Sequence, residues 1–345
     1  KNSGLGTISN EEGNFQLTAP KSVDILITYL GYKTATIPAT EFTDATKTIA
    51  LEQSEEVLEE VMVVNIPLHI YLRDIIAVSK ARFNKPILLH TYYREFVKSN
   101  NKYVKFSDGL LDYHISGSTK KTKSDVVIKQ NRSFLLIDEE EDEGSNSFQD
   151  LQKVISRSYE FAYFTERLLD EKHYEDYDFE LKSKKDKSGN ELHTISFEPK
   201  TEVEKALHKG TITFDPKTKL ICEVETTLAP SHMKYLRTIN LLIAKISVLD
   251  SKYKASFKMV NSNYFMNYSN RYSKARIWNK KHDYLEESRS DLVVTDFEKD
   301  DLNFNKKEVY NKKRLFDKPT HYTEKFWQKN NAIVLTAEEE EIIAS

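Results

Sequence analysis

Apolar and polar residues alternate with period two over much of the chain after residue 86. Alternation of this kind is typical of antiparallel strands that bury one face. Turn residues join some of these runs: Ser188-Gly189-Asn190 and Asp215-Pro216-Lys217-Thr218 each predict a β-hairpin. The strands expected from this pattern are Ile87–Lys98, Gly109–Ile115, Val126–Lys129, Ser133–Ile137, Tyr177–Lys182, Leu192–Phe197, Gly210–Phe214, Leu220–Thr227, Leu241–Leu249, Tyr253–Val260, Tyr264–Tyr268, Ala275–Asn279 and Asp283–Thr295.

Helical spacing is found in two places. Apolar residues recur at helical intervals from Pro67 to Phe83, with Pro67 in the first turn and Pro86 just beyond the end. This amphipathic helix is expected to pack on the sheet through Leu72, although a partner-binding face would show the same pattern. A second stretch, Phe148 to Leu169, predicts an insertion of one or two helices. We therefore expect residues 65–345 to form one antiparallel sheet domain with helices.

The first part of the chain has a different pattern. The turn Asn10-Glu11-Glu12-Gly13 separates two short extended runs and predicts a β-hairpin. The segment Val23–Leu30 is β-branched and apolar enough for a buried strand. Further strands are expected at Lys33–Ile37 and Thr46–Leu51, and Val57–Val64 leads out of the module.

Four motifs of this module resemble those of the carboxypeptidase-regulatory-like domain family. They are Gly6-Thr7, Glu12-Gly13-Asn14-Phe15, Tyr29-Leu30-Gly31-Tyr32-Lys33 and Leu58-Glu59-Glu60-Val61-Met62-Val63-Val64. The resemblance covers residues 1–64 and implies a small prealbumin-like β-sandwich. In that family, which is abundant in Bacteroidetes cell envelopes, the domain often precedes a TonB-dependent outer-membrane receptor or a periplasmic domain. Because the family has one or two strands upstream of the position of Lys1, a truncated sandwich is expected here.

Residues 65–345 resemble the lipoprotein-localisation-factor architecture, in particular through the hairpin from Gly210 to Thr227. That resemblance implies a curved half-barrel sheet with helices in its concave face. In the localisation factors this face holds acyl chains or apolar peptide-like groups. Here the face either binds a lipid or is filled by the chain's own helix, and both readings stay open. The expected fold class is mainly β (α+β).

Charge and composition narrow the function further. The 51 basic and 54 acidic residues nearly cancel, so a nucleic-acid partner is not expected. No run of 18 apolar residues occurs, and a membrane-spanning helix is not expected either. The single cysteine, Cys222, excludes an internal disulfide and is expected to be a small core residue rather than a catalytic thiol.

Candidate catalytic and metal-ligating residues are few. His321 and Glu324 have the His-x-x-Glu spacing of zinc carboxypeptidases, but no histidine follows them to complete a zinc site. The acidic run Asp138–Glu143 lacks the glycine spacing of a calcium loop and is expected to be a solvated loop. We therefore expect no enzyme activity, no cofactor and no metal. Three histidines are expected to form cross-strand pairs: His90, His114 and His193. Two acidic pairs are expected to be solvated rather than to act as a glycosidase pair: Glu139 with Glu141, and Asp176 with Asp178.

The function expected from the sequence is a non-catalytic periplasmic scaffold subunit, associated with an outer-membrane β-barrel or TonB-dependent-receptor-like complex. The alternatives are a periplasmic carrier or chaperone that shelters an acyl chain or an unfolded outer-membrane segment, and an uncharacterised hydrolase. The charge-rich segment Asp296–Thr320 has little periodicity and is either an arm that orders on a partner or a plain surface loop. Its expected partner-binding anchors are Phe297, Phe304, Tyr310 and Phe316.

Overall fold

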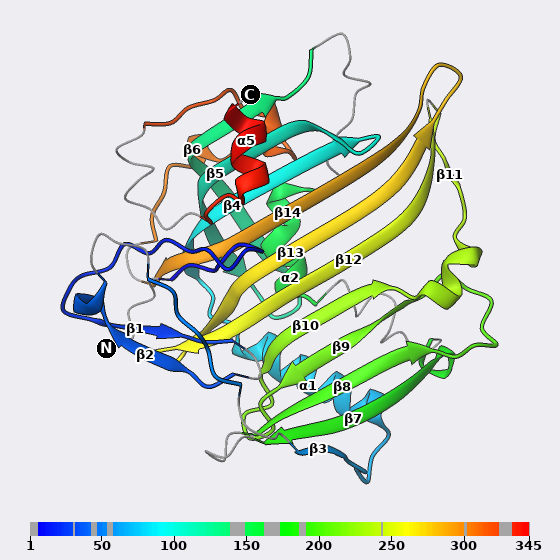
Figure 1. Cartoon of the computed structure of the whole chain (residues 1–345). Helices are drawn as coiled ribbons and strands as arrows, with labels where there is room; N and C mark the ends of the chain where they lie inside the picture. The colour runs from blue at the N-terminus through cyan, green and yellow to red at the C-terminus, as the bar shows by residue number, and fades with distance from the viewer. Residues whose placement is uncertain are drawn as a thin grey trace.

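The alternating segments form one antiparallel sheet of twelve strands, mainly in the order β3-β7-β8-β9-β10-β12-β13-β14-β4-β5-β6, with β11 beside β12. The computed structural model describes residues 6–29, 32–42, 47–53, 58–138, 149–161, 173–185, 191–242, 244–299, 302–323 and 333–344. The sheet is curved and not closed, as expected for a half-barrel (Figure 1). Its strands are β3 (Leu58–Val61), β4 (Ile87–Ser99), β5 (Lys102–Gly117), β6 (Thr122–Leu135), β7 (Tyr177–Lys185), β8 (Glu191–Pro199), β9 (His208–Phe214), β10 (Ile221–Leu228), β11 (Ile239–Asn240), β12 (Lys245–Val260), β13 (Asn263–Trp278) and β14 (Asp283–Glu298).

Both predicted hairpins are present. Strands β7 and β8 pair in register from Tyr177 with Pro199 to Lys185 with Glu191. In the turn between β9 and β10, the Asp215 carboxylate accepts hydrogen bonds from the backbone N–H groups of Lys217 and Thr218 at 2.7 and 2.9 Å. The β9–β10 turn forms because the side chain of Asp215 satisfies backbone donors that a chain reversal leaves unpaired. The turn predicted at Ser188-Gly189-Asn190 lies outside the described residues.

Several predicted strands are parts of longer ones. Strands β12, β13 and β14 each have 16 residues, and β13 runs unbroken through the expected break between Tyr268 and Ala275. The two short strands expected after residue 125 are also one, β6. The strand predicted at Leu241–Leu249 begins too early, because Leu241 begins a turn and β12 starts only at Lys245. Pairing with neighbouring strands, which local spacing does not contain, sets these limits.

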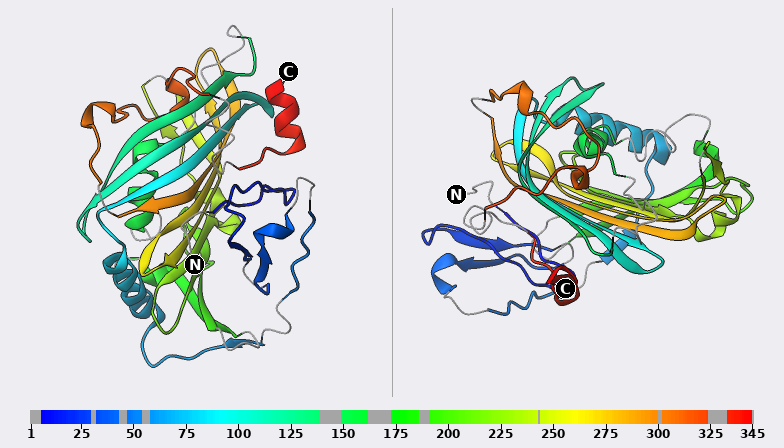
Figure 2. Two further views of the ribbon diagram at one scale, coloured as in Figure 1. Left: turned by 90° about the vertical axis from the view of Figure 1, so that its left-hand side faces the viewer. Right: turned by 90° about the horizontal axis from the view of Figure 1, so that it is seen from above.

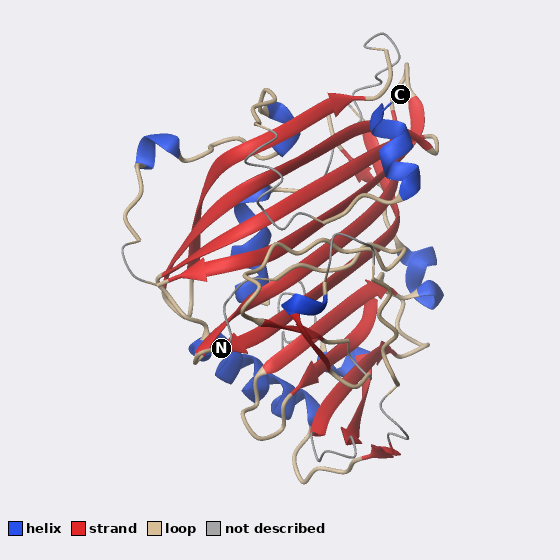
Figure 3. Ribbon diagram, turned by 60° about the vertical axis from the view of Figure 1, so that its left-hand side comes forward, coloured by secondary structure: helices blue, strands red, loops and turns tan. Residues whose placement is uncertain are grey.

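The two faces of the sheet carry different parts of the chain (Figure 2). The helices α1 (Leu68–Arg82) and α2 (Val154–Tyr159) lie on the concave face. The helix predicted at Pro67–Phe83 is thus confirmed, and its residues Leu72, Ile75 and Ile76 are buried. On the convex face lie the N-terminal module and the C-terminal helix α5 (Ala337–Ala344). Figure 3 shows the strands as one continuous layer between these two sets of elements.

The N-terminal module contains a two-stranded antiparallel sheet of β1 (Asp24–Ile27) and β2 (Ala35–Pro38). The turn at Asn10 forms as predicted, and Gly13 takes a positive φ of 84°. The flanking residues do not form the expected ladder of strands; the N–H of Gly6 instead donates to the carbonyl of Thr295 in β14 at 3.0 Å. The predicted regular hairpin was therefore wrong, because the large sheet competes for its backbone groups.

The last motif of the module also belongs to the large sheet. Leu58–Val61 forms β3 and pairs with β7 at one end of the sheet, from Leu58 with Lys185 to Val61 with Lys182. The prediction that this motif only closes the module was incomplete, since β3 links the module to the sheet. No helix in the described part of the chain is long and apolar enough to cross a bilayer.

Candidate functional site

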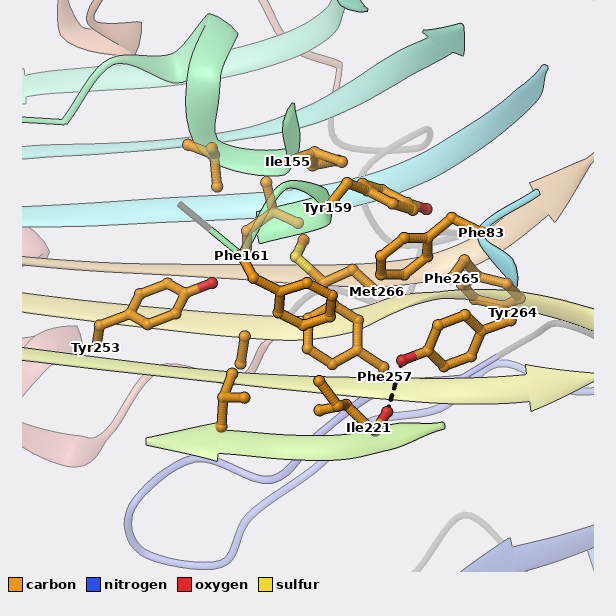
Figure 4. Close-up of a cluster of buried hydrophobic side chains, with 14 of the residues drawn as sticks. Phe83, Ile155, Tyr159, Phe161, Ile221, Tyr253, Phe257, Tyr264, Phe265 and Met266 are labelled. Carbon is orange, nitrogen blue, oxygen red and sulfur yellow. Dashed lines mark hydrogen bonds between the residues drawn. The ribbon is translucent and has the colours of Figure 1, made fainter. Parts of the chain in front are cut away.

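Aromatic side chains fill the concave face between α1 and α2 (Figure 4). Phe83, at the end of α1, contacts Tyr159 of α2 edge to face at 4.0 Å between ring centroids and stacks on Tyr264 of β13 at 4.7 Å. Phe161 lies 5.3 Å from Phe257 of β12. All five rings are buried. Aromatic clusters of this kind contribute large buried areas and favour edge-to-face or offset contacts.

Polar groups at the same place are also paired. The hydroxyl of Tyr264 donates to the carbonyl of Ile221 at 2.7 Å, as Figure 4 shows, and the N–H of Ile221 donates to the Ser79 hydroxyl at 3.0 Å. Helix α1 is thus fixed to β10 by hydrogen bonds as well as by packing. This region is a core of the protein's own side chains.

Beyond this core the concave face becomes polar. One cross-strand row runs from Tyr253 through Arg271, Ser290 and Glu95 to Ser107. Glu95 is 3% exposed, its Oε2 accepts a hydrogen bond from the Tyr93 hydroxyl at 3.1 Å, and its Oε1 has no hydrogen-bond partner. Burial raises the pKa of Glu95 to about 8. The sequence analysis missed Glu95, although a glutamate on the inward face of an otherwise apolar strand is a signal for a buried carboxyl group.

A second polar cluster lies on the convex face. Nε of Arg94 lies 3.0 Å from Asp291, and its NH1 lies 2.9 Å from Glu339 of α5. All three side chains are almost fully buried. Glu339 also accepts a hydrogen bond from the N–H of Thr336, and the Thr336 hydroxyl accepts from the N–H of Glu339. This reciprocal pair is a capping box, so one glutamate both starts α5 and holds it on the sheet.

The four predicted anchor residues do not gather in one patch, and each is half-buried against the protein itself. The Phe297 ring lies 4.7 Å from Phe265 of β13, and Phe304 stacks on His114 of β5 at 3.7 Å. The Tyr310 hydroxyl donates to the carbonyl of Arg314 at 2.6 Å, and the Phe316 ring lies 5.3 Å from Nζ of Lys105. Their role as partner-binding residues stays a prediction.

The segment that carries three of these residues lies along β6. Val309 forms a bridge with Val127, and His321 forms another with Asn131. Between these points a shallow open depression of about 480 Å³ is lined by Val127, Ile128, Lys307, Glu308, Val309, Tyr310, Asn311, Lys312 and Lys318. The described residues of Asp296–Thr320 that follow β14 thus lie along the edge of the sheet, as the surface-loop alternative predicts. Residues 300 and 301 lie outside the described residues.

The candidate metal-ligating and catalytic residues are placed as follows. No three of their His, Cys, Asp and Glu side chains are placed to hold a metal ion. His321 is held by backbone hydrogen bonds to Asn131, and Glu324 lies outside the described residues, as do Glu139 and Glu141. Burial raises the pKa of the Cys222 thiol to about 11, so the thiolate needed for nucleophilic attack is disfavoured.

Exposed apolar residues follow β3 at the margin of the sheet. Val61 is 64% exposed and Val63 is 92% exposed, and Ile66 just before α1 and Ile70 in its first turn are also exposed. Strand β3 has only four residues, and among the described strands only β7 pairs with it. Its outer backbone groups therefore lie at an open sheet edge, beside the apolar side chain of Val61.

Comparison with known proteins identifies the first part of the chain. Residues 1–64 match the CarboxypepD_reg-like domain family. These residues, which include β1, β2 and β3, are therefore similar to a CarboxypepD_reg-like domain, as their motifs predicted. A comparison with curated proteins found no match.

Two solved structures resemble parts of the chain. One is a DUF1329 family protein from Desulfovibrio piger, with 8% identity over 64% of this chain and 90% of that one, and a TM-score of 0.26. The other is lipovitellin, in a structure concerned with lipid–protein interactions, with 10% identity over 63% of this chain and 26% of that one, and a TM-score of 0.26. At these TM-scores neither likeness supports an inference about this chain.

Proposed function

We propose that this protein is a non-catalytic interaction subunit that works in the periplasm as part of an outer-membrane-associated complex. The observation that carries the proposal is the open edge at β3, where the exposed residues Val61, Val63 and Ile66 follow one another. An edge strand offers unpaired backbone N–H and C=O groups, and apolar side chains beside it add specificity for a partner strand. We expect a partner protein to bind along this edge.

Two further observations support the proposal. The CarboxypepD_reg-like domain resembles modules that precede outer-membrane receptors, and β3 joins this domain to the large sheet. The concave face between α1 and α2 is filled by Phe83, Tyr159 and their neighbours. A carrier for an acyl chain needs an open apolar cavity at that place, so the packing there favours an interaction protein.

Affinity purification tests this proposal. The tagged protein is purified from detergent-solubilised outer membranes of its native host, and the partners are identified by mass spectrometry. We expect an outer-membrane β-barrel protein to co-purify. Val63→Lys places a charge in the middle of the proposed contact and is expected to lower the yield of the partner about tenfold, as truncating a central contact does elsewhere.

Met233→Lys is a matched control, because Met233 is an exposed apolar residue outside this edge. Its yield should equal that of the wild type. Alanine at Phe297, Phe304, Tyr310 and Phe316 is a less specific test, because it also removes contacts with the sheet. A wild-type protein that fractionates as a free soluble monomer would contradict the proposal and favour the carrier.

A further inference from the structure

The turn that connects β11 to β12 exposes apolar side chains. Ile239 is 49% exposed, Leu241 is 51% exposed, and Leu242 is fully exposed to solvent. The N–H of Leu241 donates to the carbonyl of Ala244 at 2.8 Å, which closes the turn and holds these side chains outward from the sheet. Turns on a protein surface are normally polar, so three exposed apolar residues within four positions indicate a contact outside the chain. We call Ile239, Leu241 and Leu242 the apolar tip.

A second turn lies beside the apolar tip. Lys245 pairs with Trp278 and Ile246 pairs with Ile277, so the end of β13 adjoins the start of β12 (Figure 1). The turn from β13 to β14 is held by Asn279, whose side chain accepts hydrogen bonds from the N–H groups of Lys281 and His282 at 2.7 and 2.9 Å. The two turns together form one end of the long strands.

The charged residues around the apolar tip are mainly basic. From Thr226 to Leu249 the sequence contains no Asp or Glu, although acidic residues slightly outnumber basic ones in the whole chain. In the neighbouring turn Asp283 is paired with Arg276, with 2.6 Å between NH2 and Oδ2. The exposed cations near the apolar tip, which we call the basic collar, are Arg237, Lys245, Lys280 and Lys281.

We propose that the apolar tip inserts into the interface of an anionic lipid bilayer while the basic collar contacts the lipid phosphates. Apolar side chains ringed by lysine and arginine match a membrane surface, because burial of the tip and attraction to anionic headgroups act together. Trp278 pairs with Lys245 of the collar, and tryptophan is enriched at membrane–water interfaces. This inference goes beyond the proposed function. It concerns contact with a lipid surface at one end of the long strands, whereas the proposed function concerns the binding of a protein along the edge at β3.

Co-sedimentation with vesicles tests the inference. The purified chain is mixed with vesicles of phosphatidylcholine alone, or of phosphatidylcholine with phosphatidylglycerol in a ratio of three to one. We expect binding to the anionic vesicles, and this binding should weaken as salt is added because salt screens the collar. Leu241→Asp/Leu242→Asp is expected to lower the affinity by at least about tenfold, since it removes the inserted groups. Lys280→Glu/Lys281→Glu should abolish the preference for anionic vesicles.

Leu26→Asp is the matched control, since Leu26 is also apolar and exposed but lies on β1, away from the apolar tip (Figure 1). It should bind vesicles like the wild type, and all variants should keep the wild-type melting temperature because the changed residues are exposed. Wild-type protein that stays in the supernatant would overturn the inference. So would a Leu241→Asp/Leu242→Asp variant that sediments like the wild type, because charge alone would then explain the binding.

A fluorescent probe tests insertion separately. An environment-sensitive dye is attached to Leu242→Cys, and in parallel to Leu26→Cys, in a Cys222→Ser background. The dye at Leu242→Cys should shift to shorter wavelength on anionic vesicles, and the dye at Leu26→Cys should not. Binding without this shift would overturn the insertion of the tip. These assays contain no protein partner, so their failure leaves the co-purification test of the proposed function unaffected.

Discussion

At the residue scale, His90 shows how a predicted cross-strand pair works. It lies directly opposite Asp112 on β5 and Asp296 on β14. Nδ1 of His90 lies 2.7 Å from the Asp112 carboxylate, and Nε2 lies 2.9 Å from that of Glu298. The hydrogen bond to Asp112 is the main cause that raises the pKa of His90 to about 9. The histidine is therefore charged at neutral pH and bridges three strands.

A raised pKa predicts a pH-dependent stability. The charged form of His90 stabilises the fold fully below its unfolded pKa of about 6.5, and this stability is lost as the pH rises through about 9. We expect His90→Asn to lower the free energy of unfolding by about 1 to 2 kcal/mol at pH 6, after allowance for solvent screening, and by much less at pH 10. Urea titrations at both pH values measure this. His282→Asn, in an exposed turn, should show no such trend; equal losses for His90→Asn at both pH values would contradict the assignment.

At the element scale, the helices α1 and α5 are held on the sheet in different ways. Helix α1 is held by burial of Leu72, Ile75 and Ile76 on the concave face. Helix α5 is held by the contact of Glu339 with Arg94 and by the burial of nearby Ile333 in the convex cluster. Packing tolerates the exchange of one apolar side chain for another of similar size, whereas removing one partner of a buried ion pair strongly lowers the stability of the fold.

Leu72→Asp tests the register of α1. The side chain is 1% exposed, so an aspartate there would be buried without a partner. We expect the free energy of unfolding to fall by more than about 3 kcal/mol, measured by urea or thermal denaturation. Ile70→Asp on the exposed side of the same helix is the control and should change it by less than about 1 kcal/mol. An unchanged melting temperature for Leu72→Asp would refute the register.

Glu339→Ala tests the attachment of α5. The change removes the capping box and leaves Arg94 with one carboxylate fewer, so we expect a loss of about 2 to 4 kcal/mol. Limited proteolysis should then cut the C-terminal segment faster than in the wild type. Glu340→Ala, at an exposed position of the same helix, is the control and should behave like the wild type. Equal protease resistance of Glu339→Ala and the wild type would show that Ile333 and the contacts with the N-terminal turn hold the segment without Glu339.

At the scale of the whole molecule, the sheet separates a packed helical face from a face where both ends of the chain meet. Ile8 and Ile333 pack in one cluster with Tyr92, Leu110 and Val293. The Glu12 carboxylate accepts a hydrogen bond from the N–H of Ala337 at 3.2 Å, which joins the N-terminal turn to α5. The CarboxypepD_reg-like domain is thereby attached to the sheet through several elements.

The whole-molecule prediction concerns metal chemistry. The purified protein is expected to bind no stoichiometric zinc and to show no peptidase activity, because His321 is held at a backbone bridge and no third ligand joins it among the described residues. Any bound zinc should be removable by a chelator without unfolding. Elemental analysis of protein purified in the presence of zinc measures this. One tight zinc ion per chain would refute the non-catalytic reading.

Local features were determined by the sequence. The hairpins β7–β8 and β9–β10, the limits of α1 and the turn at Asn10 all follow from residue spacing and turn chemistry within about twenty residues. The identity of the first 64 residues was also readable, because its motifs lie in one continuous segment. These features need no partner from a distant part of the chain.

Long-range pairing was decided only by the tertiary structure. The sequence contains no local signal that β14 pairs with β4, that β3 joins β7, or that β12 to β14 continue unbroken for 16 residues. The partners of Arg94 were hidden for the same reason, since Arg94 meets an aspartate at position 291 and a glutamate at position 339. Such contacts depend on which strands become neighbours, and that choice is made by burial over the whole sheet rather than by any one segment.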